Sequence, residues 1–333
     1  MKPLIPKVFL VIVALAAGIP AWAQGCVTRD EIPAASRTAI ESAAQQVFDQ
    51  ASRGDANALR QNAIPSLQSN FGGIAGAVND NKPALTGAKT QLRIEFLLDT
   101  GATPPADGLF FCGVFGAGGM SSGSAQFEIP GLPAGKYAVV IQDFIGSKGP
   151  YALTTIFQEA SGGWKLAGFY VRPESAGGHD GLWYLERARE YKAKSQNHNA
   201  WFYYLTSWDL MAPVTFMDTA LLSKISQESN SALPKDVPVG GKPVSYSANG
   251  KTYNITDMSV FRTENSFDLS IKYSVASAAD FNATLADAQS LARAFAAQYP
   301  ELKDAFNNVW AHAIDPNGAD VTGLVNLKPA AKP

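Results

Sequence analysis

The residues best suited to metal or acid–base chemistry are few and lie far apart in the chain. The histidines are His179, His198 and His312, and the cysteines are Cys26 and Cys112. A zinc site needs several such side chains at short spacing, and the sequence contains no H-x-x-x-H, H-x-H or C-x-x-C pair. We therefore expect neither a dedicated metal site nor a bound cofactor.

One short stretch matches a catalytic motif. Residues 119–123, GMSSG, fit the pattern G-x-S-x-G, and Asp143 and His179 follow in the chain order of an α/β-hydrolase triad. That motif works where a strand enters and a helix leaves, because this turn exposes the serine beside backbone N–H donors. Here a strand-like segment, QFEI, follows in place of a helix. We interpret the stretch as a Gly/Ser-rich loop and do not expect Ser121 to be a nucleophile.

The first 23 residues have the three parts of a secretory signal peptide. Two lysines precede an apolar run over residues 8–17, and the small-residue pattern AWA ends at Ala23. An apolar run of about ten residues is short for a membrane span, which needs about 20. We expect residues 1–23 to be removed and the mature chain to be exported, either periplasmic or secreted, without a transmembrane segment.

Cys26 and Cys112 form an even pair, which favours a disulfide in an oxidising compartment. The bridge would close a loop of 112 − 26 = 86 residues, and the chain-entropy model assigns such a loop about 4 kcal/mol. The alternative is a lipid anchor on Cys26, which would leave Cys112 without a partner. Bacterial lipoprotein signals usually carry an aliphatic residue three positions before the cysteine, where this chain has Ala23.

The charge composition indicates which classes of binding partner to expect. The 333 residues carry 27 Lys and Arg against 29 Asp and Glu, a formal net charge of −2, with no block of basic residues. Nucleic acid and anionic membrane surfaces are therefore not expected partners. A hydrophobic content of 46% can fill real cores, and the length predicts two or three folding units.

Hydrophobic periodicity divides the chain into helices first and strands second. Residues 36–81 repeat with the period of a helix, whereas residues 91–98 alternate, with Arg93 and Glu95 on the face opposite the apolar residues. Further strand-like segments follow at 108–115, 126–131, 136–144, 151–159 and 164–171. Helices followed by antiparallel strands indicate an α+β unit in which the helices cover one face of the sheet.

This order, together with the phrase GGWKLAGFYV at 162–171, resembles the NTF2-like (cystatin-like, SnoaL-type) cone over residues 24–172. The resemblance implies helices on a curved antiparallel sheet and an open mouth that holds a ligand. A rival resemblance comes from FEIPGLPAGKYAVVI, which is similar to the last hairpin of carboxypeptidase-regulatory-like sandwiches. Those sandwiches lack N-terminal helices, so the cone is preferred.

Some NTF2-like proteins run acid–base chemistry in the cone, and the resemblance points to Asp143 and Tyr170 for that role. Strand phase places Asp143 on one face with Tyr137, and Tyr170 on a face with Trp164. A carboxyl group in a dry pocket could act as a base, because burial raises its pKa. The alternative is that Asp143 lies at a strand end and Tyr170 packs with its hydroxyl at the rim.

Residues 173–232 predict a linker and a helical hairpin. The apolar spacing resembles one tetratricopeptide-type hairpin, without a second copy, and Arg187 stands where that pattern has leucine. Aromatic residues are concentrated here. Phe202 and Tyr203 point away from the predicted hairpin seam, so they either dock the hairpin onto a neighbouring domain or present an exposed recognition patch.

Residues 233–333 predict a small α/β domain that ends in a disordered tail. The Asn249-Gly250 pair favours a tight hairpin, and a helix is expected over residues 280–299. The whole pattern suggests a non-catalytic binding or scaffold protein of a bacterial cell envelope, which binds a small ligand or an envelope protein. The competing hypothesis is a small-molecule enzyme that uses Asp143 and Tyr170.

Overall fold

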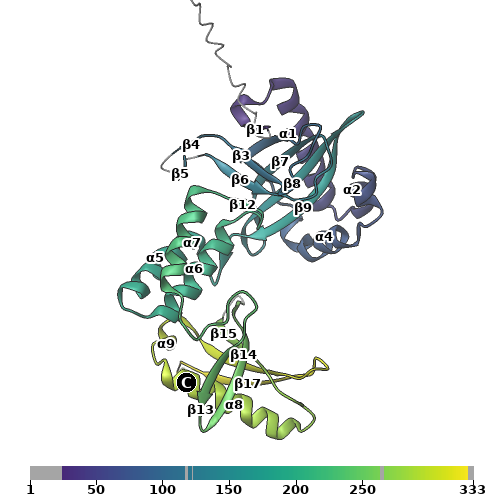
Figure 1. The fold of residues 1–333 in the computed structure, drawn as a ribbon. Coiled ribbons are helices and arrows are strands. Elements are labelled where there is room, and N and C mark those ends of the chain that lie inside the picture. The colour runs from purple at the N-terminus through teal and green to yellow at the C-terminus, as the bar shows by residue number, and fades with distance from the viewer. Residues whose placement is uncertain (1–24, 117–118, 122, 263–265, 329–333) are drawn as a thin grey trace, which may run out of the picture.

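The structure, a computed structural model, describes residues 25–116, 119–121, 123–262 and 266–328. The predicted signal segment 1–23 and the predicted disordered tail therefore lie outside the described residues, apart from the start of the tail. Figure 1 shows an N-terminal unit of helices and strands, three helices in the middle and a C-terminal α/β unit. The α+β class predicted from the sequence is confirmed.

The helices of the N-terminal unit come first in the chain, as predicted. They are α1 (Ala34–Ser52), α2 (Ala56–Gln61), α3 (Pro65–Gln68) and α4 (Gly72–Leu85). Gly54, with a φ of +71°, ends the first of them. The carboxylate of Asp55 then accepts the N–H of Ala58 at 3.0 Å and caps the second.

A five-stranded antiparallel sheet carries these helices on one face. Its strand order is β1 (Gly25–Thr28), β2 (Thr90–Asp99), β7 (Lys136–Gly146), β8 (Gly149–Ala160) and β9 (Gly163–Pro173). A buried cluster that includes Ile40, Phe48 and Leu153 fills the space between helices and sheet. Residues 36–81 therefore do pack against the strands.

The opposite face of this sheet is covered as well, which the sequence did not predict. A small sheet in the order β12 (Met217–Asp218), β6 (Ala125–Glu128) and β3 (Leu109–Cys112) lies against it, and the side chains of Phe96, Phe110 and Phe127 are buried between the two sheets. The next hairpin consists of β4 (Phe115–Gly116) and β5 (Gly119–Met120). The unit is thus a layer of helices, a large sheet and a small sheet.

The predicted disulfide joins the two sheets. Cys26 on β1 is bonded to Cys112 on β3, with a Cα–Cα distance of 4.8 Å. A lipid anchor would need the same sulfur atom of Cys26, so that alternative does not fit the structure. No helix in the described part of the chain is long and apolar enough to cross a membrane.

The middle of the chain forms the predicted hairpin and one further helix. After the short strands β10 (Ser175–Ala176) and β11 (His179–Asp180) come α5 (Gly181–Ala193), α6 (Asn197–Met211) and α7 (Ala220–Ala232). The first two helices cross closely at Gly181, where an added Cβ would lie 2.3 Å from Met211 Cγ. Ser207 donates to the carbonyl of Gly181 at 2.7 Å across the same crossing.

The C-terminal unit is a mixed five-stranded sheet with a helix on one face. The strand order is β13 (Val244–Ala248), β14 (Lys251–Arg262), β15 (Phe267–Ser274), β16 (Asn308–Ile314) and β17 (Asp320–Asn326). The β15–β16 pair is parallel and the other pairs are antiparallel. The crossover carries α8 (Phe281–Gln298) and the short α9 (Leu302–Ala305). Asn249 and Gly250 have positive φ angles of 54° and 74°, as the predicted tight turn requires.

The middle helices and the C-terminal sheet share one hydrophobic core. Phe202 and Tyr203 lie inside it, with exposed fractions of 1% and 5%. Their rings make edge-on contacts with Phe306 and Phe267, with centroids 5.9 Å and 5.1 Å apart. The hypothesis of an exposed recognition patch at Phe202 and Tyr203 is therefore wrong, and the docking alternative is right. The boundary predicted at residues 232/233 runs through this common core.

Two features tie the N-terminal unit to the rest of the chain. The carboxylate of Asp209 on α6 pairs with Arg172 on β9 and with Arg262 on β14, so one side chain contacts all three parts. Val214 and Met217, which follow α6, return to the core between the two N-terminal sheets. The units are therefore connected by packing as well as by the chain.

Candidate functional site

A cleft of ≈ 660 Å³ opens between the helical hairpin and the C-terminal unit. One wall comes from α5 and α6, and the other from the start of β15, the end of α9 and the residues beside them. The aromatic cluster noted in the sequence supplies much of the lining, namely Trp183, Tyr184, Tyr191 and Tyr203, together with Phe267. Clefts of this size at a junction between units are common ligand sites.

The rim of the cleft is built by the first turns of α5 and the residue pair before it. His179 stacks on Trp183, with ring centroids 3.7 Å apart and an interplanar angle of 7°. The Arg187 guanidinium lies 5.4 Å from the centre of the same indole ring, because residues four apart share a helix face. Asp180 fixes the start of this helix by accepting the N–H of Trp183 at 2.8 Å. The rim is thus an indole held between two nitrogen-rich groups.

The tyrosine hydroxyl groups at the back of the cleft donate hydrogen bonds to backbone carbonyls. Tyr191 donates to the carbonyl of Asp304 at 2.7 Å, and Tyr203 donates to that of Ala305 at 3.0 Å. Burial raises the pKa of the Tyr203 hydroxyl and, to about 12, that of Tyr184. These phenols stay protonated at neutral pH, so they are donors and flat walls and not bases.

The charge of the lining is positive although the chain as a whole is slightly acidic. Its described residues include three cations, Arg187, Lys194 and Lys328, against one carboxylate, Asp304. Arg187 pairs with Glu190, and Asp304 accepts the amide of Gln196 at 2.9 Å. Within the described ranges, the ammonium groups of Lys194 and Lys328 have no carboxylate partner. Two cations are therefore available to a ligand.

The described lining residues combine aromatic side chains with cations, and none of them is a serine or cysteine held by a histidine. Among the described residues, no group of three His, Cys, Asp or Glu could hold a metal ion. The arrangement can hold an anion beside a flat apolar group.

The structure places Asp143 and Tyr170 elsewhere and apart. Asp143 is paired with Arg93, whose Nε lies 2.7 Å from its Oδ1, and Arg93 also pairs with Glu174. Tyr170 packs edge-on against Phe216 at 5.2 Å and is 40% exposed. Both residues lie on the sheet face turned away from the helices, but strand β8 lies between them, and they pair with different residues of it, Ala152 and Thr154. The dry pocket that acid–base chemistry would need does not surround them.

A β-bulge explains part of this outcome. The register between β8 and β9 shifts at Ala167, so that Leu166 pairs with Phe157 and Gly168 with Ile156. Leu166 therefore faces the helices, whereas Tyr170 faces the opposite side. The predicted common face of Trp164 and Tyr170 is wrong for this reason.

The hydrolase-like motif is not assembled into a triad. Ser121 lies in a loop, and its hydroxyl is 2.8 Å from that of Ser124. Asp143 is bound to Arg93, and His179 is stacked at the rim of the cleft. Within residues 119–123, Gly119–Met120 form the short strand β5, so the loop interpretation holds only for the described residues after it, Ser121 and Gly123.

Sequence reasoning missed one buried ionisable residue, Glu95. Alternation places it opposite the apolar residues of β2, but that face is covered by the helices, and the side chain is fully buried. Its Oε1 contacts Arg29 at 3.1 Å, and Arg29 also pairs with Glu41 at 2.6 Å. Burial raises the pKa of Glu95 to about 7, partly opposed by Arg29. A single acidic residue in an alternating strand pattern does not indicate that its side chain is buried or that its pKa is raised.

Replacing Glu95 by glutamine is expected to stabilise the protein at pH 8 by about 3 kcal/mol and to leave it unchanged near pH 4.5. With a folded pKa of about 7 against 4.5 in the unfolded chain, the folded state holds a proton that the unfolded state loses. Wild-type stability therefore falls as the pH rises from 4.5 through 7. Urea unfolding at pH 5 and pH 8 measures the difference, with Glu128→Gln as the exposed control. A loss of stability at pH 8 in Glu95→Gln would contradict the raised pKa.

Comparison of the chain with protein-family models, curated proteins and solved structures found no match. The resemblance to NTF2-like proteins therefore stays a prediction. What the chain does has to be argued from the cleft and from the surfaces around it.

Proposed function

We propose that this is a non-catalytic exported binding protein whose ligand occupies the cleft between the helical hairpin and the C-terminal unit. The ligand is a small molecule with a flat apolar part and an acidic group. The observation that carries the proposal is the pairing of aromatic walls with the lysines Lys194 and Lys328, in a protein whose net charge is −2. The apolar part would lie beside the His179–Trp183 stack at the rim of the cleft, and the anion would lie near the lysines.

Export is supported by the signal-like segment 1–23 and by the Cys26–Cys112 bridge, because disulfides persist in oxidising compartments. A periplasmic or secreted location is the one proposed. The enzyme alternative loses its support, since Asp143 is ion-paired and Tyr170 is distant from it.

The test is a thermal-shift comparison of aromatic acids with their neutral amides on the chain without its first 23 residues. The probes are benzoate, 4-hydroxybenzoate and indole-3-acetate, each against its carboxamide. We expect the acids to stabilise and the amides to be weaker, and a ligand at a hundredfold excess over its Kd adds about 2.7 kcal/mol. Acetate provides the charge without the ring and should have little effect.

Lys194→Gln combined with Lys328→Gln should abolish the preference for the acids. Lys224→Gln is the matched control, because Lys224 is exposed on α7 and does not line the cleft. Equal effects of acids and amides, or a preference for acids that survives the double substitution, would contradict the proposal.

A further inference from the structure

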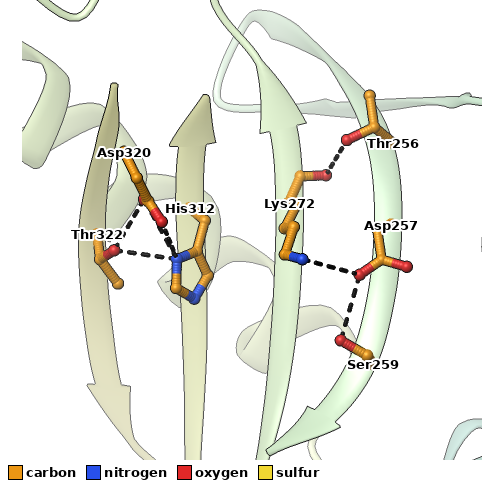
Figure 2. Close-up of polar contacts among 7 residues, drawn as sticks. All are labelled: Thr256, Asp257, Ser259, Lys272, His312, Asp320 and Thr322. Carbon is orange, nitrogen blue, oxygen red and sulfur yellow. Dashed lines mark hydrogen bonds and ion pairs between the residues drawn. The ribbon is translucent and has the colours of Figure 1, made fainter. Parts of the chain in front are cut away.

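The face of the C-terminal sheet that is turned away from α8 carries its own hollow. The buried residues of β16, Val309, Ala311 and Ala313, pack toward α8, so Trp310 and His312 project from the other face. Figure 2 shows polar side chains in a row across four strands of this face, from Asp257 on β14 to Thr322 on β17. A hollow of ≈ 390 Å³ lies over these strands.

Two aromatic side chains bound the hollow on either side of β15. Phe261 projects from β14 and is 56% exposed, and Trp310 projects from β16. Strands two apart are about 10 Å from each other, so the two aromatic side chains start from backbones separated by that distance. The floor between them includes the small side chain of Ser270, which pairs with Trp310 in the register. The hollow is therefore a slot.

The indole of Trp310 is held in a fixed orientation. Its Nε1 donates to Asp268 Oδ2 at 2.9 Å, and Asp268 is only 2% exposed. The other carboxylate oxygen of Asp268 accepts from Asn308 at 2.9 Å and from Ser266 at 2.5 Å. Because its N–H is already bonded, the ring offers a ligand its apolar face.

The polar end of the slot balances its charges, unlike the cleft. Lys272 lies 3.6 Å from the carboxylate of Asp257. His312 Nδ1 lies 3.0 Å from Asp320 Oδ2 and 3.0 Å from the hydroxyl of Thr322, as drawn in Figure 2. The row thus alternates donors and acceptors without a surplus cation. Hydroxyl groups, which both donate and accept, match such a row better than a single ion does.

We propose that this slot binds a pyranose ring of a neutral glycan. The apolar C–H face of the sugar packs on Trp310, Phe261 covers its other side, and its hydroxyl groups bond to the row of Lys272, His312 and Asp320. A pyranose ring has an apolar C–H face and hydroxyl groups at its edge, so it matches both halves of the slot at once. This site is separate from the cleft and does not depend on the function proposed for it.

The experiment titrates neutral tetrasaccharides into the ¹⁵N-labelled chain without its first 23 residues and follows the indole N–H signals. The probes are the tetramers of N-acetylglucosamine, cellobiose-type glucan, maltose-type glucan and mannose, with tetragalacturonate as the charged comparison. We expect at least one neutral tetramer to shift the indole signal that is absent in Trp310→Phe. Phe261→Ala should weaken the Kd of that tetramer at least tenfold, because it removes one aromatic side of the slot. The fold should stay intact, because Phe261 is exposed.

Phe281→Ala is the matched control, since Phe281 is 58% exposed but belongs to α8 on the other side of the sheet. This variant should bind with the wild-type Kd. The proposal is overturned if no neutral tetramer binds, if only tetragalacturonate binds, or if Phe261→Ala and Phe281→Ala bind alike.

Discussion

Replacing Phe202 by alanine is expected to lower the free energy of unfolding by about 3–5 kcal/mol. The ring is 1% exposed and packs between Trp201 and Phe306, at centroid distances of 4.9 Å and 5.9 Å. Its loss leaves a cavity in the core that the helices share with the C-terminal sheet. Because the core is common to both parts, we expect them to unfold together at a lower urea concentration, followed by circular dichroism.

Leu205→Ala on the same helix is the control. Leu205 is 40% exposed, so its truncation should change the free energy of unfolding by less than about 1 kcal/mol. A Phe202→Ala protein that unfolds at the wild-type urea concentration would show that the hairpin does not dock on the C-terminal sheet. In that case the hairpin would not form one wall of the proposed cleft.

Removing the disulfide is expected to cost about 4 kcal/mol in the double variant Cys26→Ala and Cys112→Ala. The bridge spans 86 residues of sequence and holds β1 on β3, so its loss frees a long loop in the unfolded chain. Each single variant should lose as much as the double variant, since either substitution breaks the same bond. Urea unfolding with and without a reducing agent measures the effect.

Val114→Ala controls for disturbance of the same loop, because Val114 is 70% exposed and lies two residues after Cys112. Wild-type protein in reducing agent should match the double variant. Mass spectrometry gives an independent check, because the bridged chain lacks two hydrogens. Wild-type stability that does not respond to reduction would contradict a structural role for the bridge.

Much of the fold could be predicted because local patterns agree with it. Alternation identified the strands around Phe96 and Val139, and helical periodicity identified α1 and α8. Asn249-Gly250 adopts the turn that its residue types favour. The even pair of cysteines is bridged, as predicted.

Other features depend on tertiary contacts that leave no local signal. Helix α6 is buried on nearly every side, from His198 to Leu210, so its sequence cannot say which face meets which neighbour. The bulge at Ala167 reverses the facing of β9, and the adjacent Gly168 does not by itself specify where the register shifts. Tyr170 was assigned to the wrong face for this reason.

The cleft joins residues that are far apart in the chain. Lys194 and Lys328 both line it, although 328 − 194 = 134 positions separate them. One local signal did exist: Arg187 stands at a position where the tetratricopeptide pattern has leucine, and it lies at the rim of the cleft. The slot on the sheet has a similar signal, because Trp310 and His312 alternate with the apolar residues of β16.

The short strand β12 affects the order in which the parts can be completed during synthesis. Met217 pairs with Phe127 at the edge of the small sheet, yet it follows both helices of the hairpin in the chain. During synthesis, which starts at the N-terminus, the edge of β6 stays uncovered until α5, α6 and then β12 have left the ribosome. The first unit to begin folding is therefore not the first to finish, and no single cut in the chain yields two complete halves.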